Sequence, residues 1–349
     1  MFNYNWKRIS ILRKNSSFEA GFEKVSDKDV APGLCFRQSF QLFEQLAEAS
    51  HGWDFDFRQL SANSVPYQLE QLSTARMLYS RVHFDSHFHQ LGGPVLGFRT
   101  FALAADTCSD FRWCGEAVSR QSLIVLPSDG EFESVSLPGF DVFTLSLSNA
   151  LLERTAETQF HRPLSAFIHS GRQVCHLAGE RLWELRALLS RLSDDMEIIG
   201  SAAVSVHQAA TLRRLERELA VLVLACLDRG DSRTPNSAGG KRMKVLARAM
   251  EVIEHRGLRA TGVTDLVARL GVSRRTLEHA FHDCLGVSPA AYLKAARLRA
   301  LHKTLLAADR NHTSVQNLCS QFGFTHHGQL AADYRKLFGE LPFTTLRRT

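Results

Sequence analysis

Two short segments near the C-terminus carry polar side chains that could hydrogen-bond to the edges of nucleic-acid bases. In the first, Leu277, Phe281 and Leu285 recur at intervals of four residues, which places them on one face of a helix. A helix of this kind could enter the major groove of DNA with its N-terminal residues on the base edges. The faces that remain carry the side chains of Arg274, Arg275, Glu278, His279 and His282.

The same arrangement recurs 53 residues later. Residues 281–289 read F-x3-L-G-x2-P, and residues 334–342 read Y-x3-F-G-x2-P. In the second copy Leu330, Tyr334 and Phe338 repeat the apolar face. Two copies in one basic segment favour two units that dock side by side on DNA. The second copy leaves outward the side chains of His326, His327, Gln329, Asp333, Arg335 and Lys336.

Each copy is preceded by the elements needed to position it. Gly271 is expected to end a short helix that starts near Thr264, and Ser273 to cap the next helix. In the second copy Thr313 to Gln316 read as a capping box, Gly323 makes the turn, and Thr325 caps the last long helix. A helix from about residue 290 to 306 would separate the two units; its basic residues are Lys294, Arg297, Arg299 and Lys303.

The charge is concentrated in this part of the chain. Residues 241–349 hold 18 Lys and Arg against 8 Asp and Glu, a net charge of +10, so with a total of +6 residues 1–240 carry −4. A basic C-terminal third on a mildly acidic body indicates a polyanionic partner for that third.

These motifs resemble the AraC/XylS family of transcription regulators over about 100 residues. Within that family, the amino-acid sequence of residues 273–281 and the N-terminal region are most similar to regulators of ethanolamine-operon type. The resemblance implies an all-α DNA-binding domain at 242–349, with helix-turn-helix units at about 264–285 and 314–338 joined by the long helix. The residues that carry it are Val272, Ser273, Arg274, Arg275, Thr276, Leu277, Phe281, Leu285, Gly286, Pro289, Tyr292, Leu293, Arg297 and Leu298, then Gln321, Phe322, Gly323, Phe324, Gln329, Leu330, Tyr334, Arg335, Phe338, Gly339 and Pro342.

In such domains the two reading helices occupy successive major grooves on one face of the DNA, about 34 Å apart. By position, the resemblance assigns base reading to Arg275, Glu278 and His279, and in the second unit to His326, His327 and Gln329. Gly328, Ala331 and Ala332 are short, so we expect the first helix to discriminate more between sequences. Phosphate contacts are assigned to Arg274, Lys294, Arg297, Arg335 and Lys336.

The rest of the chain is predicted to form a separate domain, so the fold class is α+β. A polar Gly- and Ser-containing stretch at 230–241 reads as a linker after a sensor or dimerisation domain at 1–229. Short apolar runs separated by turns make residues 50–150 β-rich, and 173–229 is helical. The resemblance implies a cupin-like β-barrel or sandwich that binds a small effector, dimerises, or does both. The residues from 38 to 49 are expected to be a helix.

Two sets of apolar residues in this domain are candidates for binding. Leu212, Leu215, Leu219 and Leu222 form a stripe that is either core or the seam of a homodimer. An effector pocket would draw on apolar strand residues, which otherwise form the core of the barrel; the candidates are Phe98, Phe101, Trp113, Phe132 and Phe143.

Residues that could support other chemistry are few. His83, His87 and His89 would share one face of a strand and could hold a divalent metal, but no further ligand completes a site, so we assign no metal and no cofactor. Nucleotide-binding, hydrolase and metalloprotease motifs are missing, which argues against an enzyme. The seven cysteines are scattered and odd in number, as expected for free thiols in the cytoplasm, and no run of 18 apolar residues predicts a membrane span.

The leading interpretation is therefore a dimeric, sequence-specific regulator of transcription, with double-stranded DNA and RNA polymerase as partners. One alternative is a cupin-like metalloenzyme fused to a DNA-binding domain. Another is a ligand-independent regulator that is controlled by protein contacts.

Overall fold

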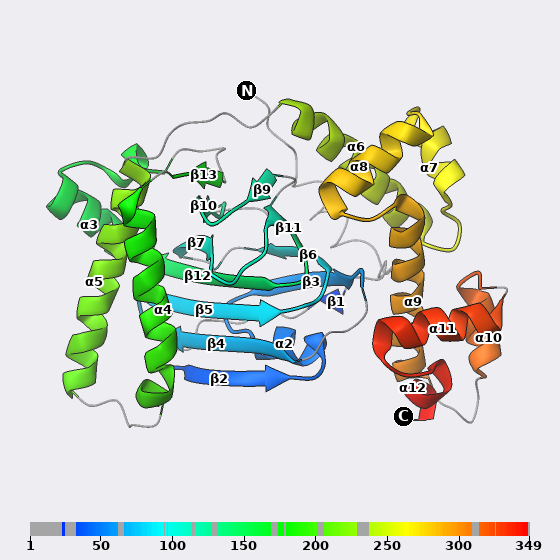
Figure 1. Ribbon diagram of the computed structural model, residues 1–349, viewed down its shortest axis with the longest axis horizontal. Helices are drawn as coiled ribbons and strands as arrows, with labels where there is room; N and C mark the ends of the chain where they lie inside the picture. Colours follow the sequence, from blue (N-terminus) through cyan, green and yellow to red (C-terminus); the bar gives the residue numbers. More distant parts are fainter. Residues whose placement is uncertain are drawn as a thin grey trace.

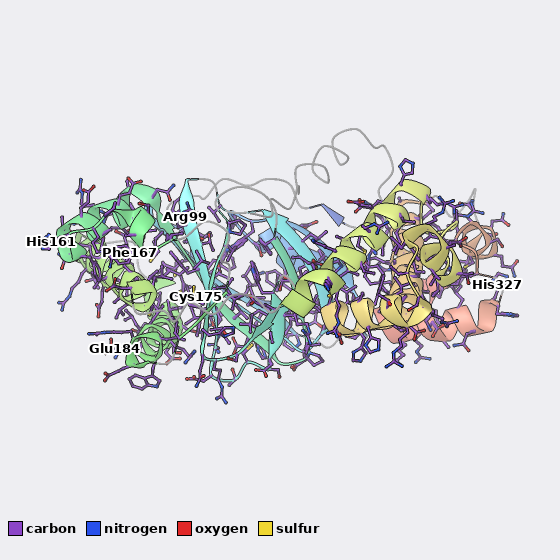
Figure 2. The ribbon with its side chains drawn as sticks, turned by 90° about the horizontal axis from the view of Figure 1, so that it is seen from above. Arg99, His161, Phe167, Cys175, Glu184 and His327 are labelled. Atoms are coloured by element: carbon purple, nitrogen blue, oxygen red, sulfur yellow. The ribbon has the colours of Figure 1, made fainter. Side chains whose placement is uncertain are left out.

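The computed structural model of the protein is built in layers: a helical layer, two β-sheets face to face, and a second helical domain beyond them (Figure 1). From above the molecule is elongated, with the two helical parts at opposite ends and the sheets between them (Figure 2). The structure describes residues 23–24, 33–61, 66–93, 95, 97–113, 116–127, 132–168, 174–177, 179–200, 206–228, 237–308, 314–324 and 326–347.

One sheet, here named the outer sheet, has its strands in the order β1-β3-β6-β11-β8-β9, and neighbouring strands are antiparallel. Its strands are β1 (Glu23–Lys24), β3 (Asp54–Gln59), β6 (Phe88–Gly93), β8 (Phe111–Trp113), β9 (Glu116–Val118) and β11 (Phe132–Ser136).

The other sheet, here named the inner sheet, has the order β13-β10-β7-β12-β5-β4-β2 and is also antiparallel. A short helix, α2 (Phe43–Ala49), follows its edge strand and lies against both sheets through Phe43. The strands are β2 (Cys35–Phe40), β4 (Tyr67–Ser73), β5 (Met77–Phe84), β7 (Phe98–Ala104), β10 (Ser122–Val125), β12 (Phe140–Ser148) and β13 (Val174–His176).

Each strand of the inner sheet contributes one face to each of two apolar cores. Residues that face the two cores therefore alternate along its sequence. Along β12, Phe143 and Leu145 face the helical layer, whereas Val142 and Thr144 face the outer sheet. The two sheets pack as a sandwich, as predicted, and the β-rich character predicted for residues 50–150 is confirmed.

The helical layer covers the face of the inner sheet that points away from the outer sheet (Figure 1). It consists of α3 (Asn149–Phe160), the short 3-10 helix η1 (Leu164–Ala166), α4 (Glu180–Gly200) and α5 (Val206–Asp228). Leu219 of α5 is completely buried in this core, and Leu212, Leu215 and Leu222 pack against it partly buried. The predicted dimer stripe therefore packs within its own chain, because α5 needs an apolar face for α3, α4 and the sheet.

The C-terminal domain is all-α, as predicted. Its core has two parts, one around Phe281 and Tyr292 and one around Leu301 and Tyr334, so each of the two repeated units has its own apolar centre. The helices are α6 (Ser237–Arg256), α7 (Val263–Leu270), α8 (Arg274–Leu285), α9 (Pro289–Ala307), α10 (Val315–Gln321), α11 (His327–Phe338) and α12 (Pro342–Arg347).

Two predictions of local structure are wrong. Residues 38–40 belong to strand β2, and the helix begins only at Phe43, because pairing with β4 determines the conformation of this stretch. Helix α6 already includes residues 237–241 at the end of the predicted linker, and residues 230–236 lie outside the described ranges. Across the described residues, no helix combines the length and the apolar character needed to cross a bilayer.

The burial of two cysteine thiols allows a direct test of the packing in the helical layer and around α8. Desolvation raises the pKa of Cys226 in the helical layer and of Cys284 in α8 to about 12 each. At pH 8 only about one in ten thousand of these thiols would be the reactive thiolate. We expect both to resist a thiol reagent in the native protein and to react after unfolding in urea, as mapped by mass spectrometry. Rapid native labelling of Cys284 would contradict the packing of α8.

Candidate functional site

The first reading helix, α8, is held by a tight turn at its N-terminus. Gly271 ends α7 with φ 63°, in the left-handed region, and the Ser273 hydroxyl then accepts a hydrogen bond from the Thr276 amide at 3.1 Å. Leu277 and Phe281 are completely buried. The packing fixes the rotation of the helix, so that Arg275, Glu278 and His279 are exposed together.

The second helix predicted to read DNA, α11, has a similar buried apolar face and shorter exposed side chains, but its N-cap makes no side-chain hydrogen bond. Leu330 and Tyr334 are buried, while His327 and Gln329 are exposed, and Gly328 beside them has open space around it. His327 lies at the outer end of the molecule, away from the sheets (Figure 2). His326 is the N-cap of the helix, and the expected cap at Thr325 lies outside the described residues.

The basic residues expected at phosphates have different surroundings. Arg274 forms an exposed ion pair with Glu278 at 2.9 Å, and Lys294 of α9 pairs with Asp333 of α11 at 3.1 Å. Arg335 and Lys336 are exposed in the last turn of α11. Since exposed ion pairs contribute little to stability, all four side chains could rotate toward a phosphate at small cost.

Arg297 is a correction to that set. Its guanidinium donates hydrogen bonds to the backbone carbonyls of Leu258 at 2.9 Å and Thr261 at 2.8 Å. Burial lowers its pKa below the usual value, and the bonds hold the connection between α6 and α7. The sequence pattern could not separate this role from a surface charge, because the carbonyls lie 36 and 39 residues away along the chain.

Helix α9 is buried on three sides, which the sequence did not indicate. Two sides pack into the cores of the repeated units, through residues such as Leu293 and Leu301. The third side, formed by Tyr292, Ala295 and Arg299, lies at helical spacing on the outer sheet. We name this contact the domain dock.

The dock is polar and buried. The Tyr292 hydroxyl lies 3.2 Å from Nδ1 of His89, whose Nε2 lies 2.7 Å from a carboxylate oxygen of Glu133. The guanidinium of Arg58 lies over the Tyr292 ring, 4.7 Å from its centre. Burial raises the pKa of Tyr292 well above its usual value, so this hydroxyl stays protonated.

Arg299 is the second anchor of the dock. It is 4% exposed, it pairs with Glu44 of α2 at 2.9 Å, and its guanidinium lies 4.2 Å from the centre of the Phe57 ring. A further hydrogen bond runs from Gln59 Nε2 to the Leu337 carbonyl at 3.2 Å. The C-terminal domain is thus attached to α2 and β3 of the N-terminal sandwich.

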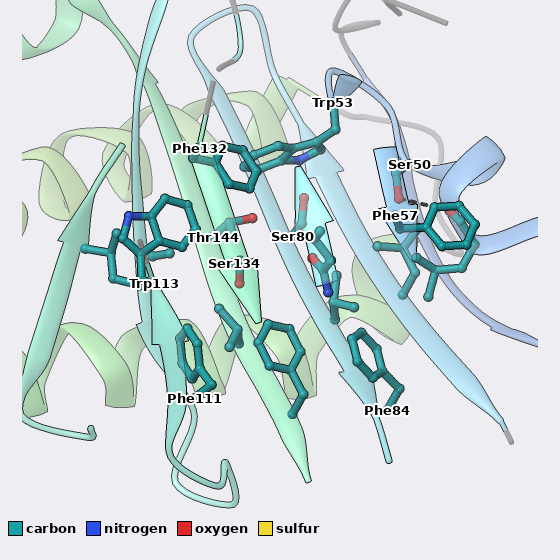
Figure 3. A pocket seen from close by; sticks show the side chains of 18 of the residues that line it. Ser50, Trp53, Phe57, Ser80, Phe84, Phe111, Trp113, Phe132, Ser134 and Thr144 are labelled. Atoms are coloured by element: carbon teal, nitrogen blue, oxygen red, sulfur yellow. Dashed lines mark hydrogen bonds between the residues drawn. The ribbon is translucent and has the colours of Figure 1, made fainter. Parts of the chain in front are cut away.

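A cavity lies between the two sheets, with about 770 Å³ of atom-free space that is partly open to solvent (Figure 3). Six polar residues line the cavity: Ser50, Gln71, Ser80, Gln90, Ser134 and Thr144. The aromatic residues of its wall are Phe43, Trp53, Phe57, Phe84, Phe111, Trp113, Phe132 and Phe140.

Two of the five residues proposed from the sequence for an effector pocket, Trp113 and Phe132, line this cavity. Phe101 and Phe143 do not, because they point to the opposite face of the inner sheet and belong to the core under the helical layer. Phe98, at the start of β7, is half-buried against the sandwich core but does not line the cavity.

The three histidines at 83, 87 and 89 have separate partners. His83 faces Asp141 at 3.7 Å, and His89 belongs to the dock. His87 lies against Gly286 of the DNA-binding domain, and desolvation lowers its pKa. Within the described ranges, no three His, Cys, Asp or Glu side chains gather in a metal-binding arrangement.

Comparison with known proteins agrees with the C-terminal architecture. Residues 266–348 match the model of a family described as "Helix-turn-helix domain", and residues 245–283 match "Bacterial regulatory proteins, tetR family". The matched ranges contain the two repeated units and the helices before them.

The relatives are transcription regulators. The chain is 22% identical over 228 residues to "XylDLEGF operon transcriptional activator 1" of Pseudomonas putida, covering 65% of this chain and 67% of that protein. It is 32% identical over 99 residues to "Probable thc operon regulatory protein" of Rhodococcus erythropolis, covering 28% and 30%. The chain thus spans about two thirds of the first relative and under a third of the second.

Among solved structures, the AraC-like transcriptional activator CuxR aligns over 82% of this chain and all of its own, with 16% identity and a TM-score of 0.40. The two relatives are described as a transcriptional activator and a regulatory protein.

The role of Arg297 can be measured through stability. Arg297→Met keeps an unbranched apolar stem and removes both charged hydrogen bonds. We expect the free energy of unfolding to fall by about 1.5–3 kcal/mol, because the two carbonyls lose a charged donor. Urea denaturation followed by circular dichroism measures this loss. The matched control is Arg275→Met on the exposed face of α8, which should change stability by less than about 0.5 kcal/mol. Equal stability of the two variants would show that the Arg297 bonds contribute nothing.

Proposed function

We propose that this chain, an AraC/XylS-type DNA-binding transcription regulator, responds to a small molecule bound between the two sheets of its N-terminal domain. The observation that carries the proposal is the position of Phe57. Its ring belongs to the wall of the cavity and also lies under the guanidinium of Arg299 in the domain dock. One side chain therefore contacts both the ligand space and the DNA-binding domain.

Helix α2 provides a second connection of the same kind. Phe43 lines the cavity and stacks on Phe88 with ring centres 4.0 Å apart. The next residue, Glu44, forms an ion pair with Arg299. A ligand that displaces Phe43 or Phe57 would move the groups that hold Arg299. Regulation requires that the ligand bind the docked and released states with different affinity, and contacts shared in this way supply that difference.

DNA reading is assigned to the exposed faces of α8 and α11. We propose that Arg275 pairs with a guanine, that Glu278 accepts from a cytosine once it leaves Arg274, and that Gln329 pairs with an adenine. His279, His326 and His327 complete the two faces. The phosphate contacts are Arg274, Lys294, Arg335 and Lys336, which position the domain without specifying sequence.

The functional unit is proposed to be a homodimer that activates transcription by contact with RNA polymerase. The P. putida relatives are described as operon activators, which favours activation. For dimer contact we propose the outer side of the helical layer, where Trp183 of α4 is 64% exposed, in place of the buried α5 stripe. This side lies at the end of the molecule opposite the DNA-binding domain (Figure 1).

A ligand-independent regulator is the second candidate, and the exposed Trp183 is compatible with control through a protein partner. The cavity favours the ligand-responsive form, since a sandwich core without a ligand would be expected to close its voids.

Base reading is tested at Arg275. After selection of genomic fragments bound by the full chain, we expect Arg275→Ala to lose about 1–3 kcal/mol of affinity for the selected site and little affinity for random DNA. Lys336→Ala is the control, because a phosphate contact should weaken binding to both DNAs and reduce the salt dependence by about one unit. An equal loss on both DNAs would reassign Arg275 to phosphate binding.

Coupling through the dock is tested at Arg299. Arg299→Leu leaves Glu44 without its guanidinium and should release the DNA-binding domain, seen as faster hydrogen exchange in β3 and α9. The affinity of the variant for the selected site should no longer respond to a ligand that changes it in the wild type. Arg259→Leu, at an exposed position of the same domain, is the control. A ligand response that is unchanged in Arg299→Leu would exclude the dock as the route of coupling.

The dimer surface is tested separately. Trp183→Asp places a charge on the exposed apolar side of α4 and should convert a dimer into a monomer in sedimentation equilibrium without loss of helicity. A variant that sediments like the wild type would exclude this surface.

A further inference from the structure

We propose that the cavity between the sheets takes an uncharged, ring-containing molecule that carries a hydrogen-bond acceptor such as a carbonyl oxygen, and that Gln90 donates to that acceptor. The inference rests on the proposed ligand-responsive function and specifies the chemical class of the ligand.

The absence of charge on the wall follows from strand register. Of the described residues that line the cavity, none is ionisable. The charged residues of the same strands alternate with the lining residues and point the other way: Glu70 and Arg81 bond to Ser193 of α4, and Glu133 bonds to His89 in the dock. A carboxylate or ammonium in the cavity would therefore be buried without a counter-charge, which costs several kcal/mol.

The aromatic groups of the wall favour a flat ring. Trp113 and Phe132 are stacked, with ring centres 4.6 Å apart and planes at 20°, and Trp53 meets Phe132 edge-on at 6.1 Å. Figure 3 shows Trp53 and Phe132 together at one end of the cavity and Phe84 and Phe111 at the other. Aromatic rings pack best on other rings in such offset or edge-on arrangements.

Gln90 supplies the polar specificity. It is 8% exposed, it lines the cavity, and its Nε2 is buried with no hydrogen-bond partner among the described residues. In register it lies between Phe57 of β3 and Ser134 of β11, in the middle of the outer sheet. An unsatisfied buried donor is costly, and an acceptor on the ligand would satisfy it.

The other amide of the wall is already satisfied. Gln71 donates to the Ser80 hydroxyl at 3.0 Å and to the His51 carbonyl at 3.2 Å, and its own oxygen accepts from the His51 amide at 2.9 Å. Gln71 therefore holds the edge of the sandwich, and Gln90 is the amide that is left for a ligand.

Three probes of similar size test separately whether the ligand must be uncharged and whether it needs a hydrogen-bond acceptor. They are 2-acetylnaphthalene, which is neutral with an acceptor, 2-ethylnaphthalene, which is neutral without one, and 2-naphthoate, which is anionic. Binding to the full chain is measured by equilibrium dialysis without DNA. We expect the acetyl compound to bind about fivefold more tightly than the ethyl compound, as one hydrogen bond contributes. Naphthoate should bind at least about a hundredfold more weakly than the acetyl compound.

Gln90→Met removes the donor at nearly constant volume and should equalise the affinities of the acetyl and ethyl compounds. Gln38→Met, at an exposed position of β2, is the control and should leave their ratio unchanged. Ala102→Leu fills the cavity from the inner sheet and should reduce the binding of both compounds, which places them in this cavity.

Naphthoate binding as tight as that of the acetyl compound would overturn the neutral class, and a ratio that survives Gln90→Met would overturn the role of Gln90. Binding that is unaffected by Ala102→Leu would place the ligand elsewhere. The proposed regulatory function has its own test. It is refuted if the acetyl compound binds in the cavity, as shown by the effects of Gln90→Met and Ala102→Leu, and the affinity of the protein for the selected DNA site does not change.

Discussion

The burial of the Arg299 guanidinium is the constraint on which the arrangement of the two domains depends. A buried charge is tolerated only when it is paired, and here the pairing partners, Glu44 and the face of Phe57, belong to the other domain. Helix α9 cannot leave the outer sheet without exposing this network to water and separating Tyr292 from His89. Under the proposed function the dock has an attached and a released state, and ligand occupancy biases the equilibrium between them.

The outer sheet serves two tasks because its residues alternate between two faces. Phe57, Gln90 and Ser134 face the cavity, whereas Arg58, His89 and Glu133 face the DNA-binding domain. Adjacent residues of one strand thus belong to the cavity wall and to the dock. A small displacement of β3, β6 or β11 reaches both, which makes a long path between the two sites unnecessary.

The repeated units of the C-terminal domain share their scaffold and differ in their surface. Buried positions such as Phe281 and Tyr334, and the left-handed glycines at 286 and 339, have the same role in both. The surfaces differ because the first unit presents Arg275 and Glu278, and the second presents Gly328 and Ala332 among its polar residues. Duplication of a fold therefore does not imply equal shares in DNA recognition.

The sequence by itself determined the two helix-turn-helix units, because their signals are local: apolar residues four apart, a serine cap, a glycine at the turn. It also indicated that residues 50–150 are β-rich. Two of the five residues proposed for an effector pocket line the cavity. Phe101 and Phe143 were assigned to the wrong face because a run of consecutive apolar residues does not reveal which alternate set faces which core. Only the tertiary structure decided that Arg297 bonds to carbonyls, that Arg299 anchors the dock and that Gln90 faces the cavity with a buried, unpaired Nε2. These roles depend on partners far apart in the chain, and a side chain's type does not reveal what packing will place beside it.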